Sequence, residues 1–456
     1  MNEQEQKFRQ MTEPPVHRLI CKLAIPCIIS MLVTSFYNMA DTFFVGMLKS
    51  NAATGAVGVV FSMMAIIQAV GFFFGHGSGN YISRELGKKN YDEASTMAAT
   101  GFYAALSAGV LICVFGQIFL EPLAYLLGST DTILPYTKDY LRVILLGAPW
   151  MTASLVLNNQ LRYQGNAMYA MVGIVSGAVL NIGLDPLLIF TFNMGVAGAG
   201  WATIISQFVS FCLLYIGVSR GSNIHIHISQ VKFQLFYFKH IIQGGLPSLA
   251  RQCLASVATI SLSHAAALLN DDAVIAAMGV VQRIMMFGAS AMIGFGQGFQ
   301  PVCGFNFGAK RHDRVLESFW FCLKVAVVLL TTLGVISFVG AEQIMTLFRK
   351  DDLEVISIGT WALRFQCMTM PLQAWIIMCN MLTQSIGYGF RASIVASGRQ
   401  GICLIPPLLI LPGILGIRGL QLAQPTSDIL TSIIAAVIVL SILKELKEKA
   451  QEQKNL

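Results

Sequence analysis

The sequence predicts an all-α integral membrane protein with twelve transmembrane helices, arranged as two six-helix lobes. Its composition, a series of long apolar runs and an internal repeat lead to this prediction. Of the 456 residues, 55% are hydrophobic and only 12% are charged, whereas roughly 25% of the residues in soluble domains are charged. A chain with so few charges belongs in a lipid bilayer.

Twelve apolar runs are long enough to cross the hydrocarbon core, which takes about 20 helical residues. They cover residues 19–44, 54–79, 96–119, 135–157, 168–190, 196–218, 238–268, 274–300, 316–340, 355–382, 392–412 and 417–442. The loops between them are short, so no large soluble domain fits. We expect a multi-pass protein of the plasma (inner) membrane.

The distribution of basic residues predicts the orientation of the chain. If both termini are cytoplasmic, most Lys and Arg fall in inside segments, as the positive-inside rule requires. The outside loops then hold Lys49, Lys138, Arg349, Lys350 and Arg418. The net charge of +7 therefore indicates membrane orientation, and we expect no nucleic-acid partner.

The second half of the chain repeats the first at a nearly constant offset. Pairs that lie 221 residues apart are Pro26 and Pro247, Gly58 and Gly279, Gly87 and Gly308, and Pro186 and Pro407. Between them the offset is 222, as for Asn158 and Asn380. Each half holds six spans, so both halves enter the membrane in the same direction. We expect a pseudo-two-fold axis along the membrane normal, with a cavity between the lobes.

These boundaries give an N-terminal lobe at residues 1–220, a cytoplasmic linker at 221–239 and a C-terminal lobe at 240–456. The N-terminal lobe has two acids inside its spans, Asp41 and Asp185. An ionisable group in hydrocarbon costs roughly 2.5 to 3.5 kcal/mol. The repeat partners of these acids are Leu262 and Pro406, so the scaffold does not require them. The asymmetry indicates a function.

Polar groups accompany the two acids at helical spacing. Asn181 and Asp185 are four residues apart and share a helix face, and Thr203 is expected at a similar depth in the outer half of the membrane. Pro186 frees the carbonyl of Ile182, which predicts a kink and an additional oxygen ligand. Together they form a candidate proton or sodium site. The alternative is a polar pair that only holds helices together.

Other polar residues are candidates for a substrate cavity. Tyr37 and Asn38 lie one turn from Asp41, and Gln282 and Arg283 lie near the middle of the eighth span. Arg283 has two possible roles, a structural ion pair with Asp428 in the last span or a contact with substrate. The sequence leaves this choice open.

The segments Tyr37 to Asp41, Asn181 to Pro186 and Gly87-Lys88-Lys89, with its echo at Gly308, resemble the multidrug and toxic compound extrusion (MATE) family. The resemblance covers nearly the whole chain. It is closer to the branch with acids in the N-terminal lobe, the DNA-damage-inducible F type. By this resemblance Asp41, Asn181, Asp185 and Thr203 form the cation-coupling cluster. It also implies that Tyr37, Tyr140 and Asn158 border the cavity, although Asn159 adjoins Asn158 and only one of the two can face inward.

The resemblance implies export of amphipathic, often cationic compounds in exchange for protons or sodium ions by alternating access. The choice of ion stays open, and sodium would bind at Asp41, Asn181, Asp185 and Thr203. The alternative is a lipid-linked oligosaccharide flippase of the same superfamily. No catalytic motif is present, so we expect no enzyme, no cofactor, and a monomer whose partners are small molecules and the lipid bilayer.

Overall fold

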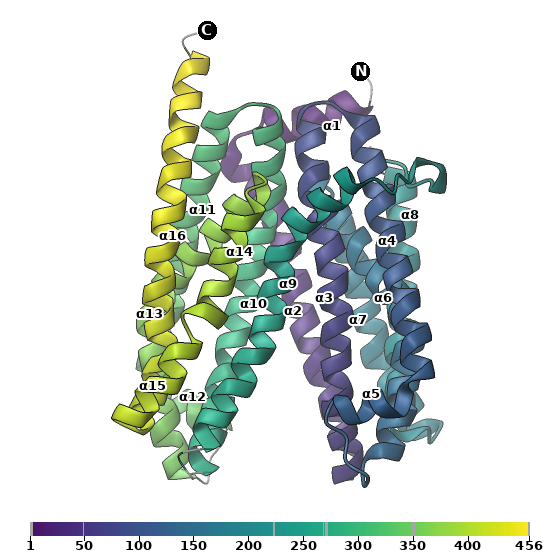
Figure 1. The fold of residues 1–456 in the computed structure, drawn as a ribbon, viewed down its shortest axis with the longest axis vertical. Helices are drawn as coiled ribbons and strands as arrows, with labels where there is room; N and C mark the ends of the chain where they lie inside the picture. The colour runs from purple at the N-terminus through teal and green to yellow at the C-terminus, as the bar shows by residue number, and fades with distance from the viewer. Residues whose placement is uncertain are drawn as a thin grey trace.

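The computed structural model describes residues 3–48, 50–221, 224–267, 269, 272–348 and 352–454, and the described chain forms two groups of long helices side by side (Figure 1). The first half contains α1 Glu3–Thr12, α2 Val16–Gly46, α3 Asn51–Gly87, α4 Tyr91–Ile118, α5 Leu120–Leu126, α6 Leu134–Tyr163, α7 Ala167–Pro186, the π-helix η1 Leu187–Thr191, and α8 Gly195–Gly221. The 3-10 helix η2 Ile228–Gln230 precedes the second half.

The second half contains α9 Leu235–Ala267, α10 Asp272–Gly308, α11 His312–Val339, α12 Ala341–Phe348, α13 Leu353–Ser385, α14 Gly389–Ser397, the π-helix η3 Gly398–Ile402, α15 Ile405–Leu415 and α16 Ile417–Lys454. Among the described residues, ten spans are long and apolar enough to cross a membrane. The long helices α9 and α13 fall outside this group. The bounds of the long helices follow the twelve apolar runs of the sequence.

Three short helices and one break were not predicted. The helices α1, α5 and α12 have no more than ten residues each, which is too short for a span. The run expected at 392–412 is divided into α14, η3 and α15. In the segment expected as linker, the backbone N–H of Lys232 donates to Thr100 Oγ1 of α4 over 3.2 Å.

The backbone repeats its unusual conformations in the two halves. Lys89 and Lys310 have φ of 62° and 60°, and Gly195 and Gly416 have φ of 58° and 59°. Both pairs are 221 residues apart in the sequence. Positive φ is rare for a residue with a side chain, so agreement at Lys89 and Lys310 is specific. The sequence repeat therefore corresponds to a repeat of local structure.

The two halves meet in close, reciprocal contacts at the end of the molecule that carries both termini. A Cβ added at Gly87 would lie 2.1 Å from the carbonyl oxygen of Phe305, and one added at Gly308 would lie 2.0 Å from that of Arg84. Phe305 and Arg84 are themselves 221 residues apart. A two-fold axis between the halves would produce this reciprocity.

We expect Gly308→Ala to lower the thermal unfolding temperature of the purified protein, because the new methyl group meets a backbone oxygen that cannot rotate away. Overpacking of this kind costs about 1–3 kcal/mol. The matched control is Gly279→Ala, which places its methyl group where nothing lies within 4 Å. Equal unfolding temperatures for the two variants would contradict the close contact.

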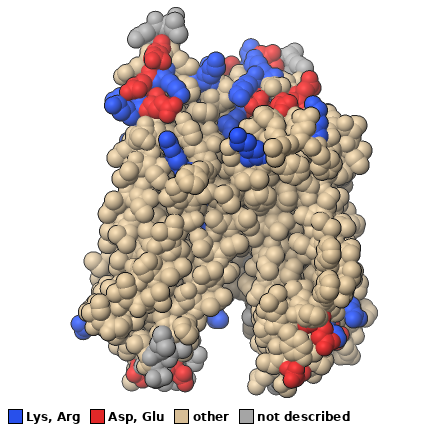
Figure 2. All heavy atoms as spheres, viewed as in Figure 1, with Lys and Arg blue, Asp and Glu red and all other residues tan. Residues whose placement is uncertain are grey.

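Figure 2 shows that a broad belt around the middle of this face has few charges, while Lys, Arg, Asp and Glu gather at its two ends. The belt fits the hydrocarbon core of a bilayer. In the same view a hollow separates the halves at the end opposite the termini, and they touch at the other end. The cavity expected between the lobes is therefore open to one side only.

Candidate functional site

The two acids singled out in the sequence lie on α2 and α7 of the first half. The side chain of Asp41 is 7% exposed and that of Asp185 is fully buried. They are close enough to interact electrostatically, and neither has an ion pair with any described residue. The structure thus buries two carboxylates near each other, and no cation of the described part of the chain pairs with them.

Asn181 connects Asp185 to the neighbouring helix α8. Its Nδ2 donates to Asp185 Oδ1 and to Thr203 Oγ1, each over 3.5 Å. With the amide turned over, the donor would reach Asp185 Oδ2 at 3.2 Å, and Asn181 Oδ1 would accept from the backbone N–H of Thr203 at 3.3 Å. The cluster therefore brings together Asn181 and Asp185, as their spacing predicts, and Thr203, as the family resemblance implies.

Several polar atoms of this region are buried without a hydrogen-bond partner in the described structure. They are Asp41 Oδ1, the hydroxyl of Tyr140 and the hydroxyl of Ser206. Tyr37 and Tyr140 both lie within electrostatic range of the two acids. An unpaired buried polar atom costs about 1–3 kcal/mol. The unpaired atoms here lie beside the two acids, where a bound ligand could supply the missing partners.

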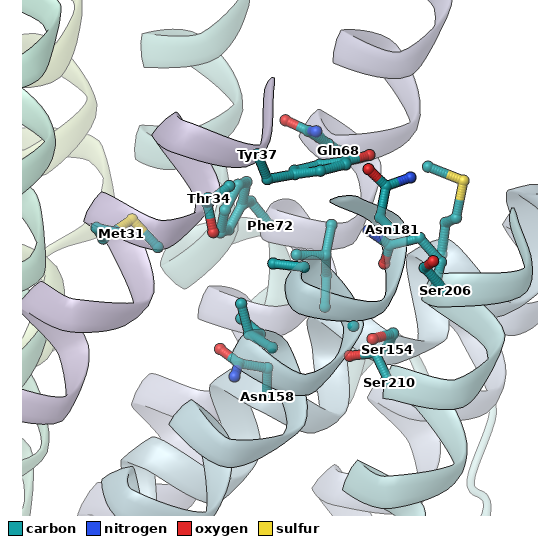
Figure 3. A pocket seen from close by; sticks show the side chains of 16 residues that line it. Met31, Thr34, Tyr37, Gln68, Phe72, Ser154, Asn158, Asn181, Ser206 and Ser210 are labelled. Carbon is teal, nitrogen blue, oxygen red and sulfur yellow. The ribbon is translucent and has the colours of Figure 1, made fainter. Parts of the chain in front are cut away.

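A cavity of about 80 Å³ adjoins the cluster inside the first half. It is lined by residues of α2, α3, α6, α7 and α8. Figure 3 shows Tyr37, Gln68 and Asn181 at one end of it and Asn158, Ser154 and Ser210 at the other. The sequence predicted a cavity between the lobes, and this additional pocket lies within one of them.

The predicted cavity residues lie in different places. Tyr37 and Asn158 line the pocket, and Asn158, not Asn159, is the one that faces it. Asn159 Nδ2 donates to the carbonyl of Leu155 over 2.7 Å. Gln282 lies in the second half, where its amide donates to Thr259 Oγ1 over 2.9 Å. The side chain of Asn38 lies outside the described residues.

Asn158 has a structural bond that the repeat explains. Its amide donates to the carbonyl of Ala170 over 2.9 Å, and its partner Asn380 donates to the carbonyl of Ala392 over 2.7 Å. Because the same bond occurs in both halves, it belongs to the scaffold. Asn158 borders the pocket while its amide group holds α6 to α7.

The structural alternative for Arg283 was wrong. Asp428 of α16 forms its ion pair with Arg399, at 2.8 Å between Arg399 Nε and Asp428 Oδ1. The break of the eleventh run at η3 places Arg399 beside α16. Arg283 is exposed on α10 and has no ion pair among the described residues.

Sequence reasoning missed most of the polar lining of the pocket. The missed residues are Thr34, Gln68, Ser154, Ser206, Gln207 and Ser210. The spacing held a signal, because Ser154 and Asn158, and also Ser206 and Ser210, are four residues apart and share a helix face. Serine is common in membrane helices as packing material, so this signal alone was weak.

The α-helical backbone of α7 ends beside the cluster. Pro186 is its last residue, and the chain continues as the π-helix η1. Proline has no N–H to donate to the preceding turn, and π-helical segments are frequent at functional sites. Pro407, its repeat partner, lies in the first turn of α15, where an N–H has no helical partner in any case.

We expect Pro186→Ala to slow turnover strongly while substrate affinity stays within a few-fold, because the acids remain but the helix gains a hydrogen bond. Pro407→Ala should have a smaller effect, since no bond is gained in a first turn. Dye efflux and dye binding by the purified variants measure the two quantities. Equal losses of turnover would show that both prolines only shape the scaffold.

A sequence profile described as MatE matches residues 26–187 and again residues 247–407. The chain belongs to the MatE family. The two matches begin at Pro26 and Pro247, the first pair of the repeat, so the MatE unit occurs once in each half. MatE proteins are membrane transporters, and this protein is therefore a transporter and not an enzyme.

Curated relatives support the same family. This MatE chain is 27% identical to the multidrug export protein MepA of Staphylococcus saprophyticus, with 91% of this chain and 92% of the relative covered. It is 25% identical to MepA of Staphylococcus aureus, with 95% and 96% covered. The relatives are therefore similar along their full length.

Solved structures agree with the fold. One is described as the outward-facing conformation of a multidrug resistance MATE family transporter, with a TM-score of 0.90, 25% identity, and coverage of 96% of this chain and 98% of that one. A crystal structure of MATE in the straight conformation gives a TM-score of 0.90 at 25% identity, with 97% and 99% covered. This MatE chain thus has the known transporter fold.

Proposed function

We propose that this protein is a multidrug efflux antiporter that exports amphipathic, often cationic compounds in exchange for protons or sodium ions. Export of several drugs is the activity named for its MepA relatives. The observation that carries the antiport mechanism is the pair of buried acids, Asp41 and Asp185, which have no ion pair with any cation of the described residues. Two such carboxylates resist simultaneous ionisation, so a proton or metal cation must accompany them.

The composition of the cluster fits either ion. Carboxylate, amide and hydroxyl oxygens are suitable ligands for a hard cation, and the same carboxylates can carry a proton. Within the described residues, no group of three or more His, Cys, Asp or Glu could hold a metal ion. Asp41 and Asp185 are only two acids, so a sodium ion would also need Asn181, Thr203 or backbone oxygens as ligands.

The pocket supports a cation-exchange role more than the flippase alternative. Its lining contains polar uncharged and apolar residues, with no Lys or Arg among those described. A site for a lipid-linked sugar diphosphate would need basic groups. With Asp41 and Asp185 both in the first half, we propose the branch with acids in that half and favour it over the flippase function.

For the membrane topology we propose twelve spans, two lobes related by an axis along the membrane normal, and cytoplasmic termini. The reciprocal contacts of Gly87 and Gly308 support the axis. The basic residues support the orientation. In this orientation the hollow of Figure 2 opens to the outside, so the structure corresponds to an outward-open state.

The decisive experiment is efflux of a fluorescent cationic dye from proteoliposomes in which a pH gradient and a sodium gradient are imposed separately. We expect one of the gradients to drive transport. We also expect the same ion to weaken dye binding at equilibrium, because coupling between two ligands is reciprocal. Dye transport and binding that respond to neither ion would contradict antiport at this site.

A further inference from the structure

The second half contains a buried charged cluster around Asp428 of α16. This carboxylate is fully buried and accepts four hydrogen bonds. Its donors are Thr369 Oγ1 at 2.9 Å, Gln373 Nε2 at 3.0 Å, Arg399 Nε at 2.8 Å and Gln424 Nε2 at 3.3 Å. The charge of Asp428 is therefore balanced inside the protein by one guanidinium.

The repeat places this cluster at the position of the pocket in the first half. At the 221-residue offset, Asp428 corresponds to Gln207, which lines the pocket. Arg399 corresponds to Ala178, or to Gly177 at the offset of 222, and both of these residues line the pocket. The guanidinium thus stands where the first half has only a methyl group or a hydrogen atom.

The remaining partners follow the same correspondence. Gln373 corresponds to Met151 of the pocket at the offset of 222, and Gln424 corresponds to Thr203 of the cation cluster at 221. Each half therefore has at least one buried carboxylate in this region, but the two halves differ in whether a protein cation pairs with it. In the first half no described protein cation pairs with the acids, and in the second half Arg399 does.

The local backbone is adapted to hold Arg399 there. Arg399 lies in the π-helix η3, between α14 and α15. In the first half, the equivalent position is Ala178, and the π-helix η1 begins only later, at Leu187 after Pro186. The backbone carbonyl of Arg399 accepts a hydrogen bond from Ser427 Oγ of α16 over 2.7 Å. A Cβ on the preceding Gly398 would lie 2.8 Å from Thr431 Cγ2, so only glycine lets η3 approach α16 so closely.

We propose that Arg399 is a tethered cation that occupies, in the second half, the position corresponding to the pocket beside the proposed coupling-ion site of the first half. Its guanidinium keeps Asp428 permanently neutralised, so the second half takes no part in ion exchange. Without Arg399, Asp428 and its three uncharged partners would form a cation site for a proton or a sodium ion. This inference rests on the proposed function for its account of the first half.

Within the described residues, Asp428 has no ion pair other than the one with Arg399. The helix α9, which packs against η3 and α16, carries Lys239, His240, Arg251 and His264, and none of them has an ion pair or hydrogen bond with Asp428 in the described structure. On α13, Arg364 stacks on Phe338 and Trp361. On α14, Arg391 stacks on Tyr388. Removal of Arg399 therefore leaves Asp428 without a substitute cation in contact.

The test uses the full-length protein in detergent, with Asp41→Asn and Asp185→Asn already introduced so that the first half no longer responds to ions. In this background Arg399→Met should gain a response that the parent lacks. Acidification, or sodium chloride compared with choline chloride, should raise its thermal unfolding temperature by about 2–4 °C, because a ligand that binds only the folded state stabilises it. Arg399→Lys keeps a tethered cation and should show no such response.

The double change Arg399→Met with Asp428→Asn removes both charges and should lose the response. If Arg399→Met responds to ions no more than this double variant does, the inference is overturned. If Arg399→Met does not fold, recovery of folding by the added Asp428→Asn supports charge balance, whereas failure of both variants overturns it. An ion response that persists in the parent background would instead contradict the proposed site at Asp41 and Asp185.

Discussion

Asp41→Asn and Asp185→Asn are each expected to reduce ion-driven efflux to the background of empty liposomes. Each change keeps the shape of the side chain and replaces one oxygen with an amide, so the site can no longer exchange a charge. Asp185 already contacts the amide of Asn181, and its surroundings accept a polar uncharged group. We therefore expect folding and expression to be maintained.

Measurements of dye binding distinguish a variant that has lost ion coupling from one that can no longer bind substrate. The two variants should still bind dye, and their binding should no longer respond to the coupling ion, because linkage disappears with the titratable group. Glu121→Gln is the matched control, since it makes the same exchange at an exposed residue that pairs with Lys138. Wild-type efflux by both asparagine variants would show that coupling resides elsewhere.

The sequence predicted the membrane class and the helix positions well, because both depend on local composition. Each long helix follows an apolar run, and the two residues Lys89 and Lys310 with positive φ lie at matching positions of the repeat. The spacing of Asn181 and Asp185 correctly placed them on one face. These features depend on helical geometry over one or two turns, which a sequence displays directly.

The errors concern contacts between distant segments. The sequence predicts Arg283 as one possible partner for Asp428, yet the partner is Arg399, which also lies within an expected apolar run. A π-helical turn changes the direction of every later side chain, since each extra residue turns a helix by about 100°. Nothing in the apolar run at 392–412 indicated where this turn would fall, so neither the break nor the ion pair was foreseen.

The same limit applies to the polar layer that joins the halves on the side of the termini. Tyr163 Oη of α6 donates to Gln300 Oε1 of α10 over 2.9 Å, and Gln300 Nε2 donates to Gln384 Oε1 of α13 over 2.9 Å. Arg162 donates to Asn159 and, across the interface, to Gln297. Each residue is unremarkable in the sequence, and only the fold brings them together.

This layer closes the molecule on one side. Arg84 Nη1 also crosses the interface, to the carbonyl of Ser385 over 2.8 Å. Under the proposed alternating access, these contacts would have to break when the transporter opens in the other direction. The free energy of these contacts would then set the balance between the two open states. A substitution at a residue that bridges the halves should shift this balance more than a substitution within one half.

Arg162→Met is expected to shift this balance toward the state open on the side of the termini and to slow efflux by about 10- to 100-fold. Arg162 is 4% exposed, and a hydrogen bond to a charged group contributes about 1.5–3 kcal/mol, which corresponds to about a 10- to 100-fold change in the equilibrium. Cys303 can report this change because its side chain is fully buried. It lies at the interface between the halves, since a Cβ added at the adjacent Gly304 would lie 2.1 Å from Ser83 Oγ of α3.

The measurement uses a protein in which Cys303 is the only remaining cysteine and follows its reaction with a membrane-impermeant maleimide added on the side of the termini. Arg162→Met should accelerate the reaction, because opening exposes Cys303. Trp375→Phe is the control, since it removes a bond of 3.2 Å from Trp375 Nε1 to the carbonyl of Ser432 within the second half. The control should leave the rate unchanged. Equal rates for Arg162→Met and the unsubstituted parent would mean that the polar layer does not hold the halves together, and closure would then have to come from the glycine contacts at Gly87 and Gly308.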